Sequence, residues 1–194
     1  MAETTKRGIK GFSGCRIWPV TANTGTTYTV GTKVDVPFAT KATVSRSVED
    51  ITLYADDGIY DSGSEFQNET LEIELQELPL ELMAKLDGAD YDSETGVYSW
   101  GANSIAPELA LGFRCLMRNG NYLMVQYYSG VVTMIKMDPT TRGDNRDGSR
   151  YTVTFKAGSR MADGKVNRKK ESTSPVDLTW LDTIDTISAG GGAG

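Results

Sequence analysis

The sequence contains no histidine, and this absence removes whole classes of mechanism. Serine and cysteine nucleophiles are commonly activated by a histidine base, and histidine is the commonest ligand of catalytic metals. The sequence also has no Gly-rich phosphate-binding loop and no Gly-x-Ser-x-Gly nucleophile motif. We therefore expect a protein that is not an enzyme and that uses no cofactor and no metal ion.

Only two cysteines, Cys15 and Cys115, occur in the 194 residues. Two thiols alone cannot form a metal cluster. Each lies in an expected strand among apolar neighbours, which is typical of a small buried side chain in a reducing compartment. The sequence leaves a disulfide between them open.

Long apolar runs are absent too. No run approaches the roughly 18 residues that a membrane-spanning helix needs. Residues 1–8 contain no apolar stretch of the kind found in signal peptides. We expect a protein that is made in the cytoplasm and does not bind membranes.

Basic residues are in the minority, because 20 Lys and Arg against 26 Asp and Glu give a net charge of −6. General nucleic-acid-binding proteins are basic, since their affinity comes from neutralising phosphates. A surface with this average charge repels DNA, so the composition argues against a protein that grips nucleic acid.

Glycine-containing turns and alternating hydrophobicity are what the sequence does have, and both predict an all-β domain. In the strand expected at Thr70–Glu77, Leu71, Ile73 and Leu75 alternate with Glu72, Glu74 and Gln76. Residues 109–132 form an alternating hairpin around Asn119-Gly120, the favoured sequence for a tight turn. Further strands are expected at Lys10–Trp18, Thr27–Val36, Ala42–Val48, Ile51–Tyr54, Val97–Trp100 and Arg150–Lys156.

One segment, Pro79–Leu86, has the pattern of a short helix that packs on a sheet. Proline suits its first turn, and Asp87-Gly88 ends it. Polar or Gly-rich composition marks residues 56–68 and 138–149 as loops, 166–182 as an extended arm and 188–194 as a flexible tail. The organisation is a single domain over residues 1–187 followed by that tail.

Three groups of side chains are candidates for chemistry or binding. Glu72 and Glu74 lie about 7 Å apart on one strand face, as a glycosidase pair does, although any solvated strand face has this spacing. The acidic stretch at residues 90–96 lacks the glycine and glutamate that a calcium-binding loop requires, so we expect a polar hairpin turn there. Trp18, Trp100, Trp180, Tyr127 and Tyr128 form either a sugar-stacking platform on a β-sandwich or core and interface anchors.

The order of several short motifs, spread over residues 8–185, resembles the phi13-type major tail proteins of long-tailed bacteriophages. These motifs are Tyr54–Asp57, Thr70–Glu77, Pro79–Leu86, Asp92–Tyr98, Ala110–Arg114, Asn119–Tyr122, Val125–Tyr128, Tyr151–Phe155 and Met161–Lys165. The chain departs from the family at residues 125–137, which are more apolar, and at residues 142–150.

The resemblance implies two packed β-sheets flanked by a helix, in a subunit that forms hexameric rings. The rings stack into a tail tube whose inner β-barrel continues across subunits and conducts DNA from capsid to host. The implied partners are other copies of the chain, the tape-measure and terminator proteins of the tail, and passing DNA. The implied location is the virion, after synthesis in the host bacterial cytoplasm.

Site residues follow from this resemblance together with the strand pattern. Glu72 and Glu74 are expected to point into the channel and to give its wall negative charge. Residues 56–68 are expected to be a loop that reaches the next ring, through Asp56, Asp57, Asp61, Glu65 and Phe66. Trp180 is expected to anchor the 166–182 arm on a neighbouring subunit.

Overall fold

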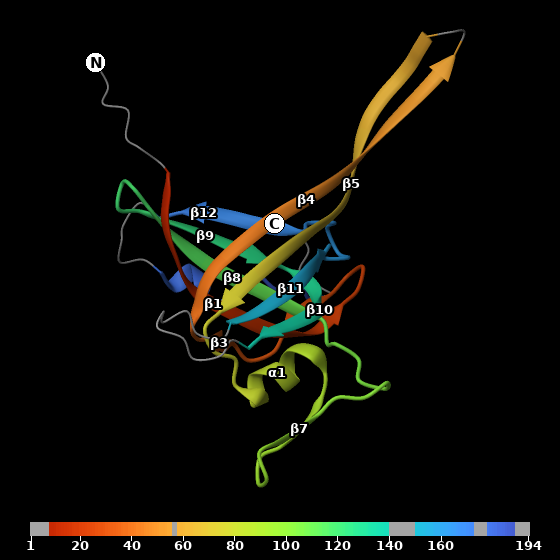
Figure 1. Ribbon diagram of the computed structural model, residues 1–194. Helices are drawn as coiled ribbons and strands as arrows, with labels where there is room; N and C mark the ends of the chain where they lie inside the picture. Colours follow the sequence, from red (N-terminus) through yellow and green to blue (C-terminus); the bar gives the residue numbers. More distant parts are fainter. Residues whose placement is uncertain (1–7, 56–57, 140–149, 173–177, 189–194) are drawn as a thin grey trace.

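The computed structural model describes residues 8–55, 58–139, 150–172 and 178–188 (Figure 1). The prediction of an all-β fold with one short helix is confirmed. A six-stranded sheet has the order β12-β9-β8-β1-β2, with β3 paired to β1, and a four-stranded sheet has the order β10-β11-β5-β4. Their bounds are β1 Ile9–Asn23, β2 Tyr28–Val30, β3 Val34–Val36, β4 Ala39–Ala55, β5 Gly58–Leu75, β8 Leu109–Met117, β9 Tyr122–Tyr127, β10 Ser129–Asp138, β11 Arg150–Gly158 and β12 Asn167–Glu171.

The two sheets pack face to face because alternating residues on each of them are apolar. In β5, Leu71, Ile73 and Leu75 are all buried, as the alternation predicted. They join one core cluster with side chains of β1, β8, β9, β10 and β11. The sheets are linked directly at Tyr128, the one residue between β9 and β10.

Local signals in the sequence account for the turns and the helix. Gly120 turns the β8–β9 hairpin with a φ of 85°. Helix α1, Leu80–Asp87, ends where Gly88 adopts a φ of 73° and donates its N–H to the carbonyl of Ala84. The apolar side of α1 covers one end of the core through Leu82 and Leu86.

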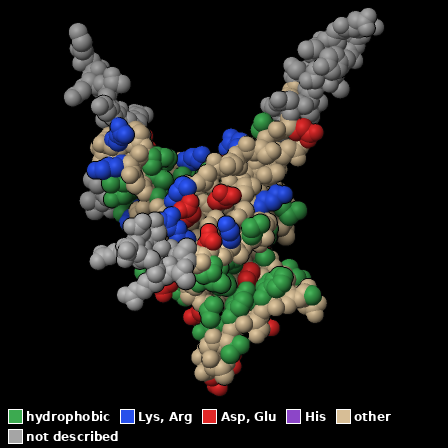
Figure 2. All heavy atoms as spheres, in the orientation of Figure 1, with side chains coloured by type: hydrophobic (Ala, Val, Ile, Leu, Met, Phe, Trp, Pro, Cys, Tyr) green, Lys and Arg blue, Asp and Glu red, His purple; other side chains and the backbone are tan. Residues whose placement is uncertain are grey.

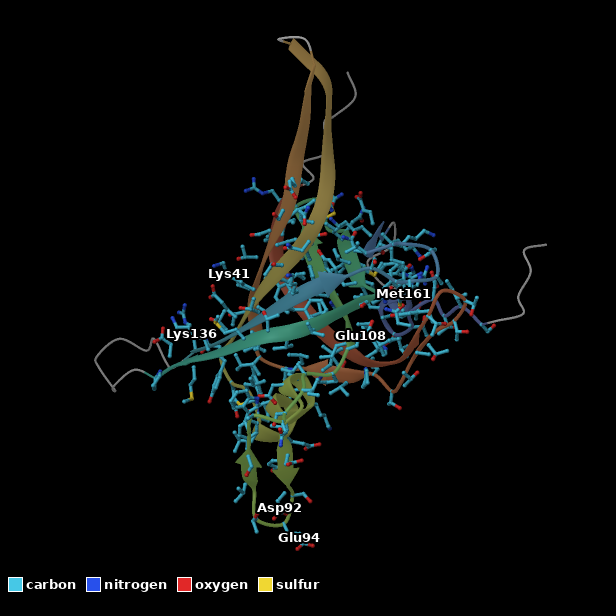
Figure 3. The ribbon with its side chains drawn as sticks, turned by 90° about the vertical axis from the view of Figure 1, so that its right-hand side faces the viewer. Lys41, Asp92, Glu94, Glu108, Lys136 and Met161 are labelled. Carbon is cyan, nitrogen blue, oxygen red and sulfur yellow. The ribbon has the colours of Figure 1, made fainter. Side chains whose placement is uncertain are left out.

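A two-stranded hairpin, β6 Asp90–Asp92 and β7 Val97–Ser99, follows α1. Asp92 accepts hydrogen bonds from the backbone N–H groups of Glu94 and Thr95, so the expected polar turn is confirmed (Figure 3). In the described part of the chain, the one α-helix, α1, has eight residues, too few to span a bilayer.

The two cysteines are free and buried, which settles the open question of a disulfide. They lie on the neighbouring strands β1 and β8, where Cys115 pairs with Phe12 rather than with Cys15. Burial raises the pKa of the Cys15 thiol to about 12, so this group is unreactive near neutral pH.

The expected loop at residues 56–68 is wrong over most of its length. Residues 58–68 belong to β5, which pairs with β4 from Ala55 opposite Gly58 down to Ala39 opposite Leu75. Two expected strands, Ala42–Val48 and Ile51–Tyr54, are therefore one continuous strand. Polar composition misled the prediction, because pairing with β4 forms this strand although its sequence has no hydrophobic alternation.

Of the residues expected in the inter-ring loop, Asp56 and Asp57 lie outside the described residues. The backbone of Asp61, Glu65 and Phe66 lies in β5, and their side chains also fall outside what the structure describes. The chain between residues 140 and 149 and the tail beyond Ser188 are likewise outside it.

Candidate functional site

The outer face of the four-stranded sheet is the surface that turns away from the core. Strand register places its side chains in rows across β4, β5, β11 and β10. One row is Lys41, Glu74, Thr152 and Lys136; the next is Thr43, Glu72, Thr154 and Met134; the third is Ser45, Thr70, Lys156 and Val131. Hydroxyl groups and charges of both signs therefore make up most of this face.

Glu72 and Glu74 both lie on this outer face, but their surroundings differ. Glu74 accepts a hydrogen bond of 2.7 Å from the Lys41 ammonium and lies 4.0 Å from Arg150. The hydrogen bond from Lys41 is the main reason that the pKa of Glu74 is lowered. Glu72 is exposed between Thr43 and Thr154 and forms no ion pair with the described residues.

Basic side chains offset the two acids on the outer face. Lys41, Lys136 and Lys156 come from β4, β10 and β11 and stand beside them. Lys41 and Lys136 lie on the same side of the molecule (Figure 3). Figure 2 shows acidic and basic side chains interspersed over this sheet. The face is close to neutral, rather than negative as we expected from Glu72 and Glu74 alone.

Paired-carboxylate chemistry fits this arrangement poorly. A glycosidase acid needs a raised pKa, whereas the pKa of Glu74 is lowered. Among the described residues, no cluster of three or more acidic or cysteine side chains is arranged to hold a metal ion.

Both edges of the four-stranded sheet are open in the described structure. Strand β4 pairs only with β5, and β10 pairs only with β11. An open edge presents a row of unpaired backbone N–H and C=O groups to which another strand can bind. Because the four strands alternate in direction, the β4 edge and the β10 edge run opposite to each other.

Strands β4 and β5 continue beyond the sheet as a two-stranded ribbon, which projects from the body of the molecule (Figure 1). Strand β11 pairs with β5 only between Glu69 and Leu75. From Asn68 to the tip, β5 pairs with β4 alone. A lone two-stranded ribbon is marginally stable in water, so a projecting one is suited to bind another surface.

A buried carboxylate fixes the ribbon at the point where it leaves the body. Glu69 is 2% exposed and accepts hydrogen bonds from Tyr127 at 3.0 Å, Asn167 at 2.8 Å and Arg46 at 3.3 Å. These donors belong to β9, β12 and β4, so one side chain ties four strands together. We missed Glu69 in the sequence, although its position two residues before Leu71 places it on the apolar side of β5.

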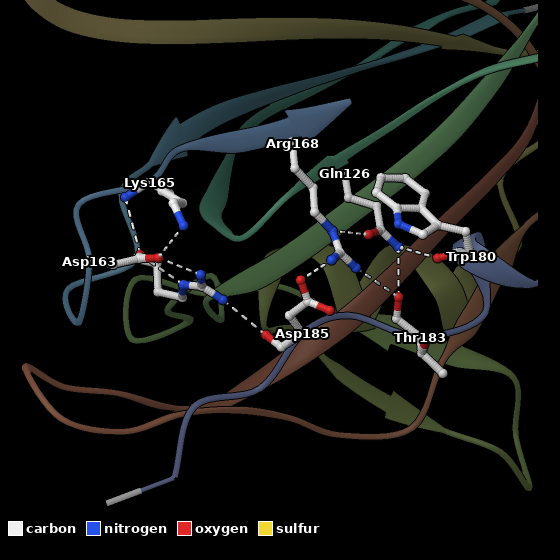
Figure 4. Close-up of polar contacts among 8 residues, drawn as sticks. Gln126, Asp163, Lys165, Arg168, Trp180, Thr183 and Asp185 are labelled. Carbon is white, nitrogen blue, oxygen red and sulfur yellow. Dashed lines mark hydrogen bonds and ion pairs between the residues drawn. The ribbon is translucent and has the colours of Figure 1, made fainter. Parts of the chain in front are cut away.

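The expected arm is partly a strand, and it folds back on its own subunit. Residues 167–171 form β12, which pairs with β9. Trp180 lies in a short 3-10 helix at Thr179–Leu181, and the Arg168 guanidinium stacks 4.4 Å from its ring centre (Figure 4). The Gln126 amide donates hydrogen bonds to the carbonyls of Trp180 and Thr183 at 3.2 and 2.9 Å.

The contacts of Trp180 that the structure describes lie within its own subunit, and the expectation that it anchors the arm on a neighbouring subunit stays a prediction. Leu181 and Ile184 are buried against the outer side of the six-stranded sheet, and Ile187 bridges to Tyr28 of β2. Sequence reasoning could not find these contacts, because the pairing of β12 with β9 is what brings Arg168 and Gln126 next to Trp180.

Acid pH should weaken the docking of this arm, because one of its ion pairs is then lost. Asp182 accepts hydrogen bonds from Lys33 at 2.8 Å and Arg16 at 2.7 Å, and these groups lower its pKa. Because the pKa of Asp182 is lower in the docked arm than in a free one, the ionised carboxylate stabilises docking at pH values above about 3.9, the ordinary pKa of aspartate. This stabilisation is lost as the pH falls through the lowered pKa of Asp182. The indole N–H NMR signal of Trp180 should stay constant from about pH 7 to pH 5 and shift below about pH 4.

The matched variant is Asp182→Asn, which keeps the side-chain volume and removes the titrating group. Its Trp180 signal should differ from the wild type at neutral pH and lose part of the acid transition. An identical acid transition in the two proteins would show that Asp182 does not hold the arm.

The five aromatic residues considered as a sugar platform do not share a surface. Trp18, Tyr127 and Tyr128 are buried, whereas Trp100 is exposed on the segment after β7. Trp180 lies on the arm, half-buried beside Arg168. These positions fit core and docking roles better than a stacking platform.

Comparison with known proteins found no match. No protein-family model matches this sequence, and no curated protein matches it at a significant level.

Proposed function

We propose that this protein is the structural subunit of a phage tail tube, in which hexameric rings stack around a channel that conducts DNA. The observation that carries the proposal is the four-stranded antiparallel sheet with two open edges and a polar, nearly neutral outer face. The hexameric number and the phage setting come from the family resemblance of the sequence.

The strand directions suit head-to-tail assembly. An even number of antiparallel strands gives a sheet whose two edges run in opposite directions, so β4 of one copy meets β10 of the next as an antiparallel pair. Repeating one such contact by rotation closes a ring, and the sheets of its members become one barrel. The projecting β4–β5 ribbon then remains free to contact the adjacent ring.

The outer face of this sheet becomes the channel wall in such a barrel. A basic wall would hold DNA by its phosphates, with strong dependence on salt. Glu72 and Glu74 offset the lysines of this face, and charges are screened beyond about 8 Å at physiological salt. Hydroxyl groups and balanced charges therefore leave DNA free to slide.

Reversing the two acids tests this role of the wall. Glu72→Lys with Glu74→Lys changes the face from three lysines and two glutamates to five lysines. Tubes should still form, because both side chains point away from the core, but phosphates should bind the wall and slow DNA ejection. Ejection kinetics from phage that carry the variant, measured at two salt concentrations, give the result.

The control for net charge is Asp90→Lys with Glu94→Lys, on the exposed β6–β7 hairpin. It adds the same charge away from the sheet and should leave ejection unchanged. Normal ejection from normal tails that carry both lysines at 72 and 74 would overturn the lumen assignment.

Electron microscopy of the purified protein tests the proposed function as a whole. We expect rings or tubes with a central channel at high protein concentration or in the presence of the tail initiator complex. A protein that remains monomeric under all of these conditions would contradict the tube assignment.

A further inference from the structure

An apolar groove lies beside the free edge of β10. Its volume is about 590 Å³, and its walls are β10, α1 and the segment that follows β7. The residues that matter most are Met83 and Asp87 of α1, Tyr98 and Trp100, and Ile135 and Met137 of β10. Trp100 is 64% exposed, which is unusual for the largest apolar side chain. Figure 2 shows hydrophobic side chains gathered on this lobe of the molecule, over α1 and the β6–β7 unit.

The rest of the chain offers no good occupant for this groove. The parts of the sequence outside the described residues are 1–7, 56–57, 140–149, 173–177 and 189–194. They are short and consist mainly of polar residues, glycine and alanine. Residues 140–149, the nearest of them to β10 along the chain, contain only polar and charged residues and glycine. An apolar surface from another molecule is therefore needed to cover it.

A complementary row lies at the opposite edge of the same sheet. Val44, Arg46 and Val48 alternate on the core-facing side of β4, in register with Leu71 and Glu69 of β5. They are only partly covered, because β4 is the edge strand of the sheet and, beyond Arg46, continues into the ribbon: Val44 is 42% exposed, Val48 53% and the Arg46 side chain 54%.

We propose that the groove receives this row, Val44, Arg46 and Val48, from β4 of a second copy of the chain. The inference rests on the proposed head-to-tail pairing of β4 with β10. In a sheet that continues from one copy into the next, side chains on the core-facing side stay on that side. The row of the incoming β4 then lies over Ile135, Met137 and the wall that contains Trp100.

Charge complementarity supports the same occupant. Asp87 is the acidic residue of the groove, and its carboxylate accepts hydrogen bonds from the Tyr98 hydroxyl and from the Ala89 N–H. Arg46 stands between the two valines of the row, and one nitrogen of its guanidinium binds Glu69 at 3.3 Å. The side chain remains 54% exposed, so in the proposed contact its outer side can meet Asp87 of the other copy. A half-buried Arg–carboxylate pair favours one register over its neighbours.

The test uses Val44→Asp and Trp100→Asp, which change the two sides of the contact without touching the core. Each places an unpaired charge in the apolar contact, so the protein concentration needed for assembly should rise about tenfold or more. The matched controls are Val97→Asp on β7, where Val97 is 53% exposed, and Ile105→Asp, where Ile105 is 83% exposed; neither side chain lines the groove. Sedimentation velocity measures assembly, and urea unfolding checks that each variant folds.

The outcomes separate this inference from the proposed function. If the wild type forms tubes and the Val44→Asp and Trp100→Asp variants assemble like the controls, the groove contact is overturned. The tube function is then unaffected. Smaller oligomers that both variants disrupt support the contact and contradict the tube. A wild-type protein that is monomeric at every concentration overturns both. Reduced acrylamide quenching of Trp100 in assemblies, measured against Trp100→Phe, provides a second readout that supports the contact.

Discussion

Shortening the β4–β5 ribbon should abolish tube formation while the subunit still folds. The variant replaces residues 49–65 by Asn-Gly, so that Val48 and Phe66, which already face each other, close a tight hairpin. The backbone of the removed part pairs only within itself and lies beyond the last residue of β5 that β11 contacts, Glu69. One described side-chain contact to the rest of the chain is lost, the hydrogen bond that Glu49 accepts from Gln67. The free energy of unfolding should therefore change by no more than about 1 kcal/mol.

The reason for the large effect on assembly is that, from Asn68 to the tip, the described strand pairing of the ribbon is between β4 and β5 alone. Two strands without a third strand or a packed face gain little stability from each other, so binding to an adjacent ring is the use that its length suggests. Electron microscopy should show single rings or dispersed subunits in place of long tubes.

A full-length control isolates the ribbon from the new turn. Replacing Asp56-Asp57 by Asn-Gly introduces the same turn sequence at the natural tip, between the paired residues Ala55 and Gly58. Tubes should form normally in this control. Normal tubes from the shortened variant as well would end the proposal that the ribbon contacts the next ring.

Much of the core was predictable because burial leaves a periodic pattern in the sequence. Leu71, Ile73 and Leu75 had to face one side of a strand, and the structure buries all three. The helix end at Gly88 and the turn at Gly120 were predictable because both require a positive φ that glycine adopts at little cost.

Elements held by pairing alone were not predictable in this way. The outer part of β5 is held in the ribbon by pairing with β4, and no hydrophobic alternation in its sequence marks it as strand. Strand β12, Asn167–Glu171, is polar and basic, and it forms because β9 offers it an edge. The sequence contains no local signal for such a long-range partner.

The electrostatics of the candidate site also depend on neighbours across strands. Glu74 looked like a free acid in the sequence, yet Lys41 lies 33 positions away and binds it directly. Its pairing follows from the register of β4 with β5, which the prediction of two separate short strands could not provide. Glu69 was within reach of sequence reasoning, since a charge in the apolar register of a strand indicates a buried polar contact.

Gly88→Ala should be the most destabilising single substitution outside the core. Gly88 ends α1 with a φ of 73°, and an added Cβ atom would lie 2.0 Å from the backbone oxygen of Ile105. A backbone atom cannot move aside as a flexible side chain can, so the segment that contains Ile105 must shift. Because this segment also forms one wall of the groove through Trp100 and Ala106, the substitution should disturb the groove as well.

Gly96→Ala is the matched control, because Gly96 has a φ of 70° and no atom lies within 4 Å of an added Cβ. It should cost about 1–2 kcal/mol, the ordinary penalty of a left-handed backbone for alanine. Gly88→Ala should cost at least about 1–3 kcal/mol more, from the overlap with Ile105. Urea unfolding of both variants measures the difference. Equal losses would mean that the contact between the end of α1 and the Ile105 backbone is loose, and that the groove wall is not held by it.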